Sequence, residues 1–286
     1  GPISMHKVFG VPGAGNGGGG RKPIGLPRFG EAEFHTRFPF GVVRLRDSKL
    51  PITVTITGWS PFIPGDADNS SLPVAGIEYE FSNTSNDQID LVYSFNSVNF
   101  IGRNNQKGVL KPFENSAVKV IDDGLLFQRL NETDPSKVDG SFAAIVREKD
   151  VHVNGILFRG AWFDPLTMAW NDIRNGACYD RPAADPDFPS SGGTIFAPFS
   201  LAPGETRTIK LQMAWYVPES TIRLGQDVEC DGDNCDCATT NDNYHPWYIS
   251  RFKQVEEVAD YWGKSYDELK KPSQQFSDCF YDTDLP

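Results

Sequence analysis

Hydrophobic and polar positions alternate along most of the chain from about Phe38 onward. In the run Ile52–Thr57, three aliphatic residues fall on one side and three threonines on the other, which is the pattern of a half-buried β-strand. Similar runs, separated by polar turns such as Pro203–Glu205, predict further strands. These runs are 42–45, 74–82, 89–97, 116–121, 124–128, 141–147 and 206–217. The pattern predicts a mainly β fold, a large two-sheet antiparallel β-sandwich.

The two ends of the chain depart from this alternation. Residues 10–20 read GVPGAGNGGGG and offer too little side chain to bury. A phosphate-binding loop would need a strand before it and a helix after it, and Arg21-Lys22-Pro23 follows instead. We therefore expect a flexible Gly-rich segment over 1–33 and the β-sandwich over 34–250.

The C-terminal residues carry a helical pattern. Apolar residues recur at helical spacing from Phe252 to Leu269, and proline lacks the backbone N–H that a helix interior needs. The sequence therefore predicts a C-terminal exit helix that ends at Pro272, followed by a separate short segment, within a helical linker over 251–286. The apolar stripe must pack either on the sandwich or on a partner domain.

Composition and charge narrow the choice of partners. The chain has 286 residues, a formal net charge of −11 and 23% charged residues, and its 27 Gly and 21 Pro indicate frequent turns. The negative charge repels nucleic acid and anionic membrane surfaces. No run approaches the roughly 20 apolar residues of a membrane-spanning helix.

Three of the five cysteines lie close together, at Cys230, Cys235 and Cys237. These thiols with His245 or Cys178 would be the ligands of a zinc site, but C-x4-C-x-C is not the paired C-x2-C spacing of zinc ribbons. If the protein is exported, a disulfide within the cluster, of Cys230 with Cys235 or Cys237, is favoured over zinc, and the cluster itself slightly favours an extracytoplasmic location. An odd count leaves at least one thiol free, and Cys279 is the leading candidate.

The same loop is rich in acidic residues. Oxygen ligands at alternate positions of Asp231–Asp236 would suit calcium, but the spacing of a calcium-binding loop with a distal glutamate is not met. We interpret it as a solvated acidic loop and predict no metal or cofactor.

Aromatic and acidic residues alternate over 162–181. The faces of Trp162 and Trp170, with Asp164 nearby, would suit binding of a pyranose ring, whereas the favoured alternative is a long loop with its aromatics packed beneath it. His245 would be a further rim contact, although a structural role is favoured. Trp162, Asp164, Trp170 and His245 are therefore the candidate substrate-rim residues. The sequence shows no G-x-S-x-G motif, and we assign no catalytic residue.

Three stretches together resemble a known family. They are 38–54, the block GWSPFIPGDADNSSLPV at 58–74, and the C-terminal residues 250–253 with 280–286. The chain resembles, over 34–286, the N-terminal domain of glycoside hydrolase family 116, which includes the non-lysosomal glucosylceramidase. The resemblance implies a two-sheet β-sandwich followed by an (α/α)6 catalytic barrel that carries the nucleophile and the acid/base. It therefore implies that the catalytic pair lies beyond Pro286, and we expect this chain alone to be inactive.

Three hypotheses for the function follow. The first is an accessory sandwich that packs on the barrel and shapes its active-site rim, in a parent enzyme acting on a β-glucoside or a glucosylated lipid. The second is a free-standing carbohydrate-binding module, supported by the aromatic stretch over 162–181. The third is a structural or adhesive sandwich without a role in sugar chemistry.

Overall fold

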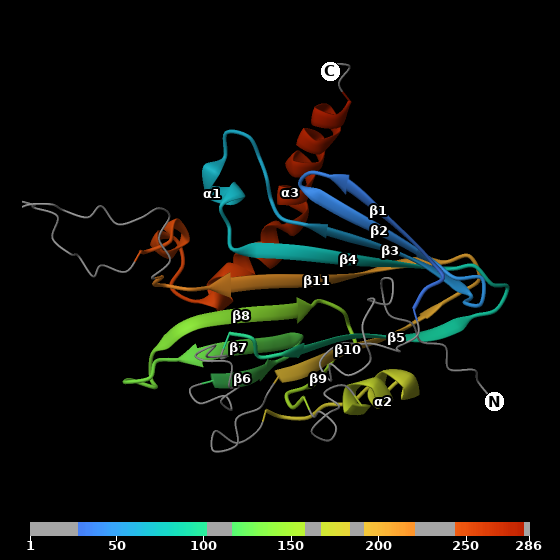
Figure 1. The fold of residues 1–286 in the computed structure, drawn as a ribbon, viewed down its shortest axis with the longest axis horizontal. Helices are drawn as coiled ribbons and strands as arrows, with labels where there is room; N and C mark the ends of the chain where they lie inside the picture. The colour runs from blue at the N-terminus through green and yellow to red at the C-terminus, as the bar shows by residue number, and fades with distance from the viewer. Residues whose placement is uncertain (1–27, 102–115, 158–166, 184–191, 221–243, 283–286) are drawn as a thin grey trace, which may run out of the picture.

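The computed structural model describes residues 28–101, 116–157, 167–183, 192–220 and 244–282. Their strands form two antiparallel sheets, one of eight strands in the order β1-β2-β3-β4-β11-β8-β7-β6 and one of three in the order β5-β10-β9 (Figure 1). The predicted mainly β, two-sheet fold with a C-terminal helix is confirmed. The strands are β1 (Glu31–Arg37), β2 (Phe40–Arg46), β3 (Ile52–Trp59), β4 (Val74–Asn83), β5 (Ile89–Val98), β6 (Ser116–Ile121), β7 (Gly124–Leu130), β8 (Val138–Val146), β9 (His152–Asn154), β10 (Gly192–Leu201) and β11 (Thr206–Tyr216).

Helices are few among the described residues. They are α1 (Ala67–Ser70), α2 (Thr167–Asn175), a short 3-10 helix η2 (Trp247–Ser250) and the long α3 (Val255–Tyr281). None of them is long and apolar enough to cross a membrane.

The apolar residues that alternate along the strands form the inner faces of the sandwich. On β11, Ile209 and Leu211 are fully buried between the sheets, and Met213 and Trp215 pack against the same cluster. Leu125, Phe127 and Phe142 lie beside them on β7 and β8 of the same sheet, and Ile195 faces them from β10 of the other sheet. Each such side chain contributes about 1.5–3 kcal/mol by its removal from water.

The strands that the sequence pattern did not predict have no alternation. All seven residues of β1 are exposed, so no apolar stripe marks it. Strand β10 is buried on almost every residue because it is the central strand of the small sheet, with the sandwich core on one face and Tyr179 packed on Phe196 on the other. A strand covered on both faces shows a continuous apolar run rather than a period of two.

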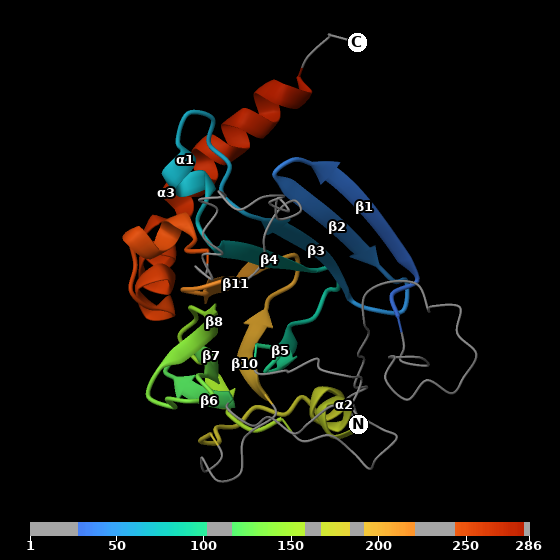
Figure 2. The same ribbon diagram turned by 60° about the vertical axis from the view of Figure 1, so that its left-hand side comes forward.

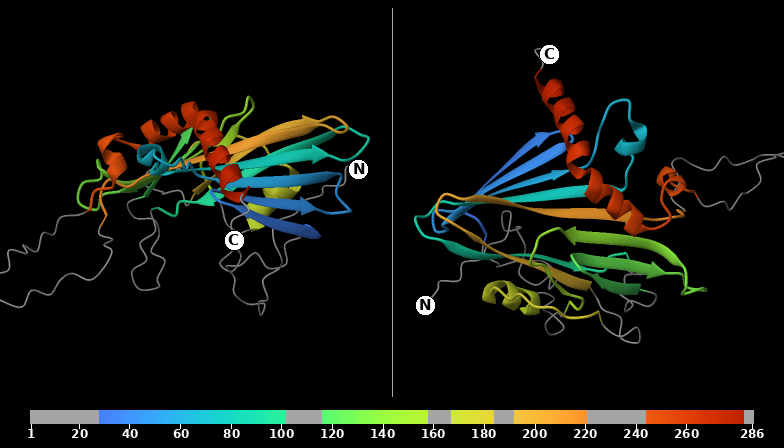
Figure 3. Two further views of the ribbon diagram at one scale, coloured as in Figure 1. Left: turned by 90° about the horizontal axis from the view of Figure 1, so that it is seen from above. Right: turned by 180° about the vertical axis from the view of Figure 1, so that it is seen from behind.

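Helix α3 forms a second core on the outer face of the eight-stranded sheet (Figure 3, left). It packs across β11, β8 and β4, with Val255, Val258, Trp262, Tyr266 and Leu269 buried against them. These residues belong to the stripe that the sequence predicted. The helix therefore closes the sandwich domain rather than standing apart from it.

The prediction that this helix ends at Pro272 is wrong, since α3 continues to Tyr281. The proline leaves the carbonyl of Glu268 without its helical partner, and Glu268 is exposed, so water can satisfy that oxygen. The Ser273 hydroxyl donates to the Leu269 carbonyl and accepts from the Phe62 amide, which holds the turn after the proline in place. No separate segment begins at Ser273.

Candidate functional site

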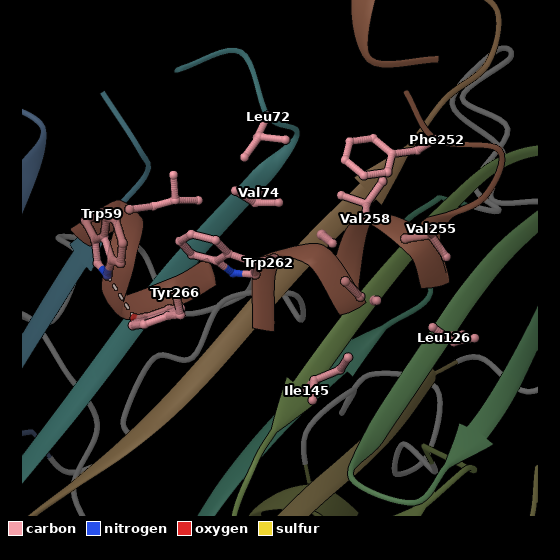
Figure 4. Packing of buried hydrophobic residues seen from close by; sticks show 14 of the residues in the cluster. Trp59, Leu72, Val74, Leu126, Ile145, Phe252, Val255, Val258, Trp262 and Tyr266 are labelled. Atoms are coloured by element: carbon pink, nitrogen blue, oxygen red, sulfur yellow. Dashed lines mark hydrogen bonds between the residues drawn. The ribbon is translucent and has the colours of Figure 1, made fainter. Parts of the chain in front are cut away.

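The first part of α3 is held against the sheet by three aromatic rings that pack on one another in tilted and edge-to-face arrangements (Figure 4). The Trp59 indole N–H donates to the Tyr266 hydroxyl at 2.8 Å, and Trp262 lies 5.1 Å from Trp59 and 4.7 Å from Tyr266 between ring centroids. Gly76 lies on β4 beneath them, and a Cβ atom there would meet the Tyr266 hydroxyl at 2.5 Å. Only glycine leaves room for this close approach.

A charged pair extends this contact. The Lys270 ammonium donates to both oxygens of Glu78, at 2.7 and 2.6 Å, and the Tyr266 hydroxyl donates to the same carboxylate at 3.1 Å. Burial, together with the Glu78 charge, raises the pKa of Tyr266, so the phenol stays neutral and remains a donor. The outer face of the sheet therefore binds α3 through both apolar and charged contacts.

The most distinctive sequence block forms the loop between β3 and β4, which lies beside α3 (Figure 2). Asp66 caps α1, and its pKa is lowered by the hydrogen bond from the Asn69 backbone and then by that from the Asn69 side chain. The Asn69 side-chain oxygen in turn accepts from the Tyr261 hydroxyl of α3 at 2.7 Å. The Trp247 indole N–H donates to Asp68 at 2.9 Å. This block therefore has a structural role, which is to clamp α3 and η2.

Beyond Ser273, α3 contributes to a partly exposed group of rings that we call the aromatic cluster: Phe38, Phe62, Phe276, Phe280 and Tyr281. Neighbouring rings lie 4.8 Å (Phe38–Phe62), 4.9 Å (Phe62–Phe276), 5.7 Å (Phe276–Phe280) and 5.2 Å (Phe280–Tyr281) apart. Phe38, Phe280 and Tyr281 are 52%, 57% and 43% exposed.

Polar contacts order this cluster although water reaches it. The Phe38 backbone N–H donates to the Tyr281 hydroxyl at 3.0 Å, and Arg37 pairs with Asp278 at 3.2 Å. The Ser277 hydroxyl donates to the Arg37 carbonyl. The cluster is thus assembled from the β1–β2 turn, the β3–β4 loop and the end of α3, and it presents a preformed apolar surface.

A second site lies on the outer face of the three-stranded sheet, under α2. The Tyr179 hydroxyl donates to Asp172 at 2.8 Å and accepts from the Asn154 amide at 3.1 Å. Burial, with the neighbouring Asp172, raises the pKa of Tyr179. These groups line a cavity of about 310 Å³, which we call the α2 pocket.

The structure does not bring the predicted rim residues together in one place. Trp162 and Asp164 lie outside the described residues. Trp170 is half-buried on α2, whereas His245 is exposed just before η2, with its Nδ1 3.0 Å from the Pro218 carbonyl. Helix α2 and the orange 3-10 helix η2 lie on separate parts of the molecule (Figures 1 and 3). A rim role for these residues stays a prediction.

The cysteine cluster and the Asp231–Asp236 loop also fall outside the described residues. Of the cysteines that are described, Cys178 is half-buried and Cys279 is exposed on α3, and both thiols are free. Burial raises the pKa of Cys178, so its thiol stays protonated. Within the described ranges, no group of His, Cys, Asp and Glu side chains is placed to hold a metal ion.

The chain was compared with protein families, curated proteins and solved structures. A family model described as "beta-glucosidase 2, glycosyl-hydrolase family 116 N-term" matches residues 10–269. Among solved structures, the chain is similar to a putative kojibiose phosphorylase from human microbiome, with 10% sequence identity and a TM-score of 0.41. That alignment covers 85% of this chain and only 23% of the phosphorylase chain. A search of the curated proteins found no match.

Proposed function

Since the chain belongs to glycosyl-hydrolase family 116 and matches the model of its N-terminal region, we propose that it is the non-catalytic β-sandwich domain of a β-glucosidase-type enzyme. In this proposal the catalytic residues lie in a following (α/α)6 domain of the same polypeptide. The sandwich packs on that domain and shapes the rim of its active site. The substrate of the whole enzyme is a β-glucoside or a glucosylated lipid.

The observation that carries the proposal is the exposed aromatic cluster at the end of α3. Large apolar side chains that gather on a surface and stay exposed mark sites of protein–protein contact. Phe280 and Tyr281 are the last aromatic residues of the described part of the chain, which ends at Asp282. A domain that follows directly along the chain is the partner best placed to cover them.

The geometry of α3 suits such a contact. Its 27 residues span about 40 Å at the rise of an α-helix. The part up to Leu269 is anchored on the sheet, and the end projects past it (Figure 2). A helix anchored over most of its length transmits the orientation of the sandwich to whatever packs on its end.

The proposal places the catalytic carboxyl groups outside the sandwich. Glycoside hydrolysis uses two carboxyl groups about 5–9.5 Å apart across a bound sugar. Asp172 is the single carboxylate among the described residues that line the α2 pocket. Asp123 has a pKa raised mainly by burial, as a general acid requires, but it sits in the β6–β7 turn beside Arg147.

An activity assay tests the proposal. The 286-residue chain and a polypeptide that continues past Pro286 into the catalytic domain are compared on an aryl β-glucoside. We expect turnover from the longer polypeptide only. Turnover by the 286-residue chain would overturn the proposal.

Two substitutions in the longer polypeptide test the contact itself. Replacing Phe280 and Tyr281 together by alanine should lower its activity or its thermal stability, because the interface loses two rings. Phe34→Ala is the matched control, since Phe34 is 66% exposed on β1 outside the cluster. Equal effects from the double variant and the control would count against the contact.

A further inference from the structure

The α2 pocket has the size and lining of a small-molecule site. Its volume of about 310 Å³ lies at the lower end of the range of about 300–1,000 Å³ that is usual for ligand pockets. Polar groups from Asn154, Asp172, Tyr179, Arg181 and Thr194 face it together with apolar side chains. The size admits one hexose ring rather than a long oligosaccharide.

Buried polar side chains form its floor. Asn154 on β9 and Thr194 on β10 occupy paired register positions and are only 3% and 2% exposed. The face of a sheet beneath a helix is ordinarily apolar, because burying polar groups is costly unless they are hydrogen-bonded. Here the Thr194 hydroxyl donates to Asn96 at 2.8 Å, and the Asn154 side-chain oxygen accepts from the Ile156 amide at 3.1 Å. The floor is therefore both polar and held in one orientation.

The walls combine acceptors, donors and an apolar surface. Asp172 and Tyr179 form a hydrogen-bonded pair, and the Arg181 guanidinium lies 5.3 Å from the centroid of the Tyr179 ring. Leu157 and Met168 contribute the apolar side. One carboxylate and one guanidinium leave the lining near zero net charge, which selects against a strongly charged ligand.

We propose that the α2 pocket binds a neutral polyhydroxy ligand of the size of one pyranose ring. The hydroxyl groups of the ring meet Asn154, Tyr179 and Asp172, which offer both donors and acceptors. Its C–H face lies against Leu157 and Met168. The site is a binding site, not a catalytic one.

This inference does not rest on the proposed function. Helix α2 lies on the side of the small sheet, whereas α3 lies on the outer side of the large sheet (Figure 3, right). Residues of α2, β9 and β10 line the pocket, and the end of α3 carries Phe276, Phe280 and Tyr281 of the aromatic cluster. Loss of sugar binding would leave the docking proposal intact, and loss of docking would leave the pocket intact.

The test measures the binding of four sugars to the 286-residue chain by saturation-transfer NMR and calorimetry. The sugars are D-glucose, D-galactose, D-mannose and N-acetylglucosamine. We expect saturable binding of at least one of them. Asp172→Asn and Tyr179→Phe should each weaken that binding by at least about tenfold, because each removes a hydrogen-bonding partner of a buried ligand hydroxyl. Asp267→Asn, an exposed change on α3, is the matched control and should bind as the parent chain does.

A further variant keeps the test decisive if the polar changes disturb the fold. Met168 is largely exposed at the wall of the pocket, so Met168→Trp should fill the space without touching the polar floor. It should abolish binding while the thermal unfolding temperature stays unchanged. The proposal is overturned if none of the four sugars binds, if binding survives Met168→Trp and Asp172→Asn, or if inorganic phosphate displaces the sugar.

Discussion

The two parts of α3 differ in what they bury. Up to Leu269 the inward side chains are large and apolar and are covered by the sheet, whereas beyond Pro272 the inward positions are the small hydroxyl residues Ser273 and Ser277. The large rings of the second part, Phe280 and Tyr281, are left exposed. The single helix therefore has two roles. Its first part stabilises the sandwich, and its second part offers a surface to a partner.

The largest effect should come from the anchored part. Trp262 is fully buried between the helix and the sheet, so Trp262→Ala leaves a cavity and should lower the free energy of unfolding by about 3–5 kcal/mol. Phe280→Ala in the same chain should change it by about 0.5 kcal/mol or less. Urea unfolding of both variants measures the difference. Similar losses in the two variants would erase the distinction between the two parts.

A smaller effect should follow from a methyl group beneath the rings. Gly76→Ala places a Cβ atom 2.5 Å from the Tyr266 hydroxyl and 2.9 Å from the Trp59 indole nitrogen, so the contact must shift. We expect a loss of about 1–3 kcal/mol by overpacking. Gly58→Ala on the adjacent strand is the matched control, because nothing lies within 4 Å of its added atom. Thermal unfolding should separate the two, and equal behaviour would contradict the close approach.

The charged contact should contribute less. Lys270→Met removes both hydrogen bonds to the half-buried Glu78 carboxylate and should cost about 1–2 kcal/mol, since water still reaches the pair in part. Lys271→Met, at the exposed neighbouring position, should be close to neutral. The comparison uses the urea midpoint. A neutral result for Lys270→Met would show that the apolar contacts alone anchor the helix.

The smallest effect concerns pH and the α1 clamp. Asp66 is ionised more readily in the folded chain than in the unfolded one, so its contribution is present above the ordinary pKa near 3.8 and is lost as the pH falls through its lower folded value. The melting temperature of the parent chain should therefore fall more steeply in acid than that of Asp66→Asn. Parallel pH profiles for the two would contradict a role for this cap.

The sequence predicted the half-buried strands well because each buries one face. In strands β3 and β11, apolar and polar residues alternate along the sequence. The apolar stripe from Val255 to Leu269 likewise predicted the helix. Strands β7 and β8 are also covered on both faces and were predicted from their continuous apolar runs. Strand β10 was missed because it begins with Gly192-Gly193 and contains Pro198, which are residues that disfavour a strand. The prediction from Pro272 failed because it considered only the local backbone. Glu268, whose carbonyl loses its helical partner, is an exposed residue, and the contacts of Ser273 hold the turn after the proline, so the helix continues.

The sites were harder to predict than the fold. Asp172 and Tyr179 lay in the aromatic stretch that the sequence singled out, but Asn154 and Thr194 come from β9 and β10, which carry no alternating pattern. The aromatic cluster likewise joins Phe38, Phe62 and Phe276 from three distant segments. Such sites depend on which strands become neighbours, and periodicity along the chain does not contain that information.

The central claim, that the end of α3 is a docking surface for a following domain, is tested most directly by amide hydrogen exchange. Exchange is measured at residues 276–281 and at Phe38, in the 286-residue chain and in the polypeptide that continues into the catalytic domain. We predict that these amides become more protected in the longer polypeptide, while those of Val258 to Leu269 are equally protected in both. Unchanged exchange at 276–281 and Phe38 would contradict the account.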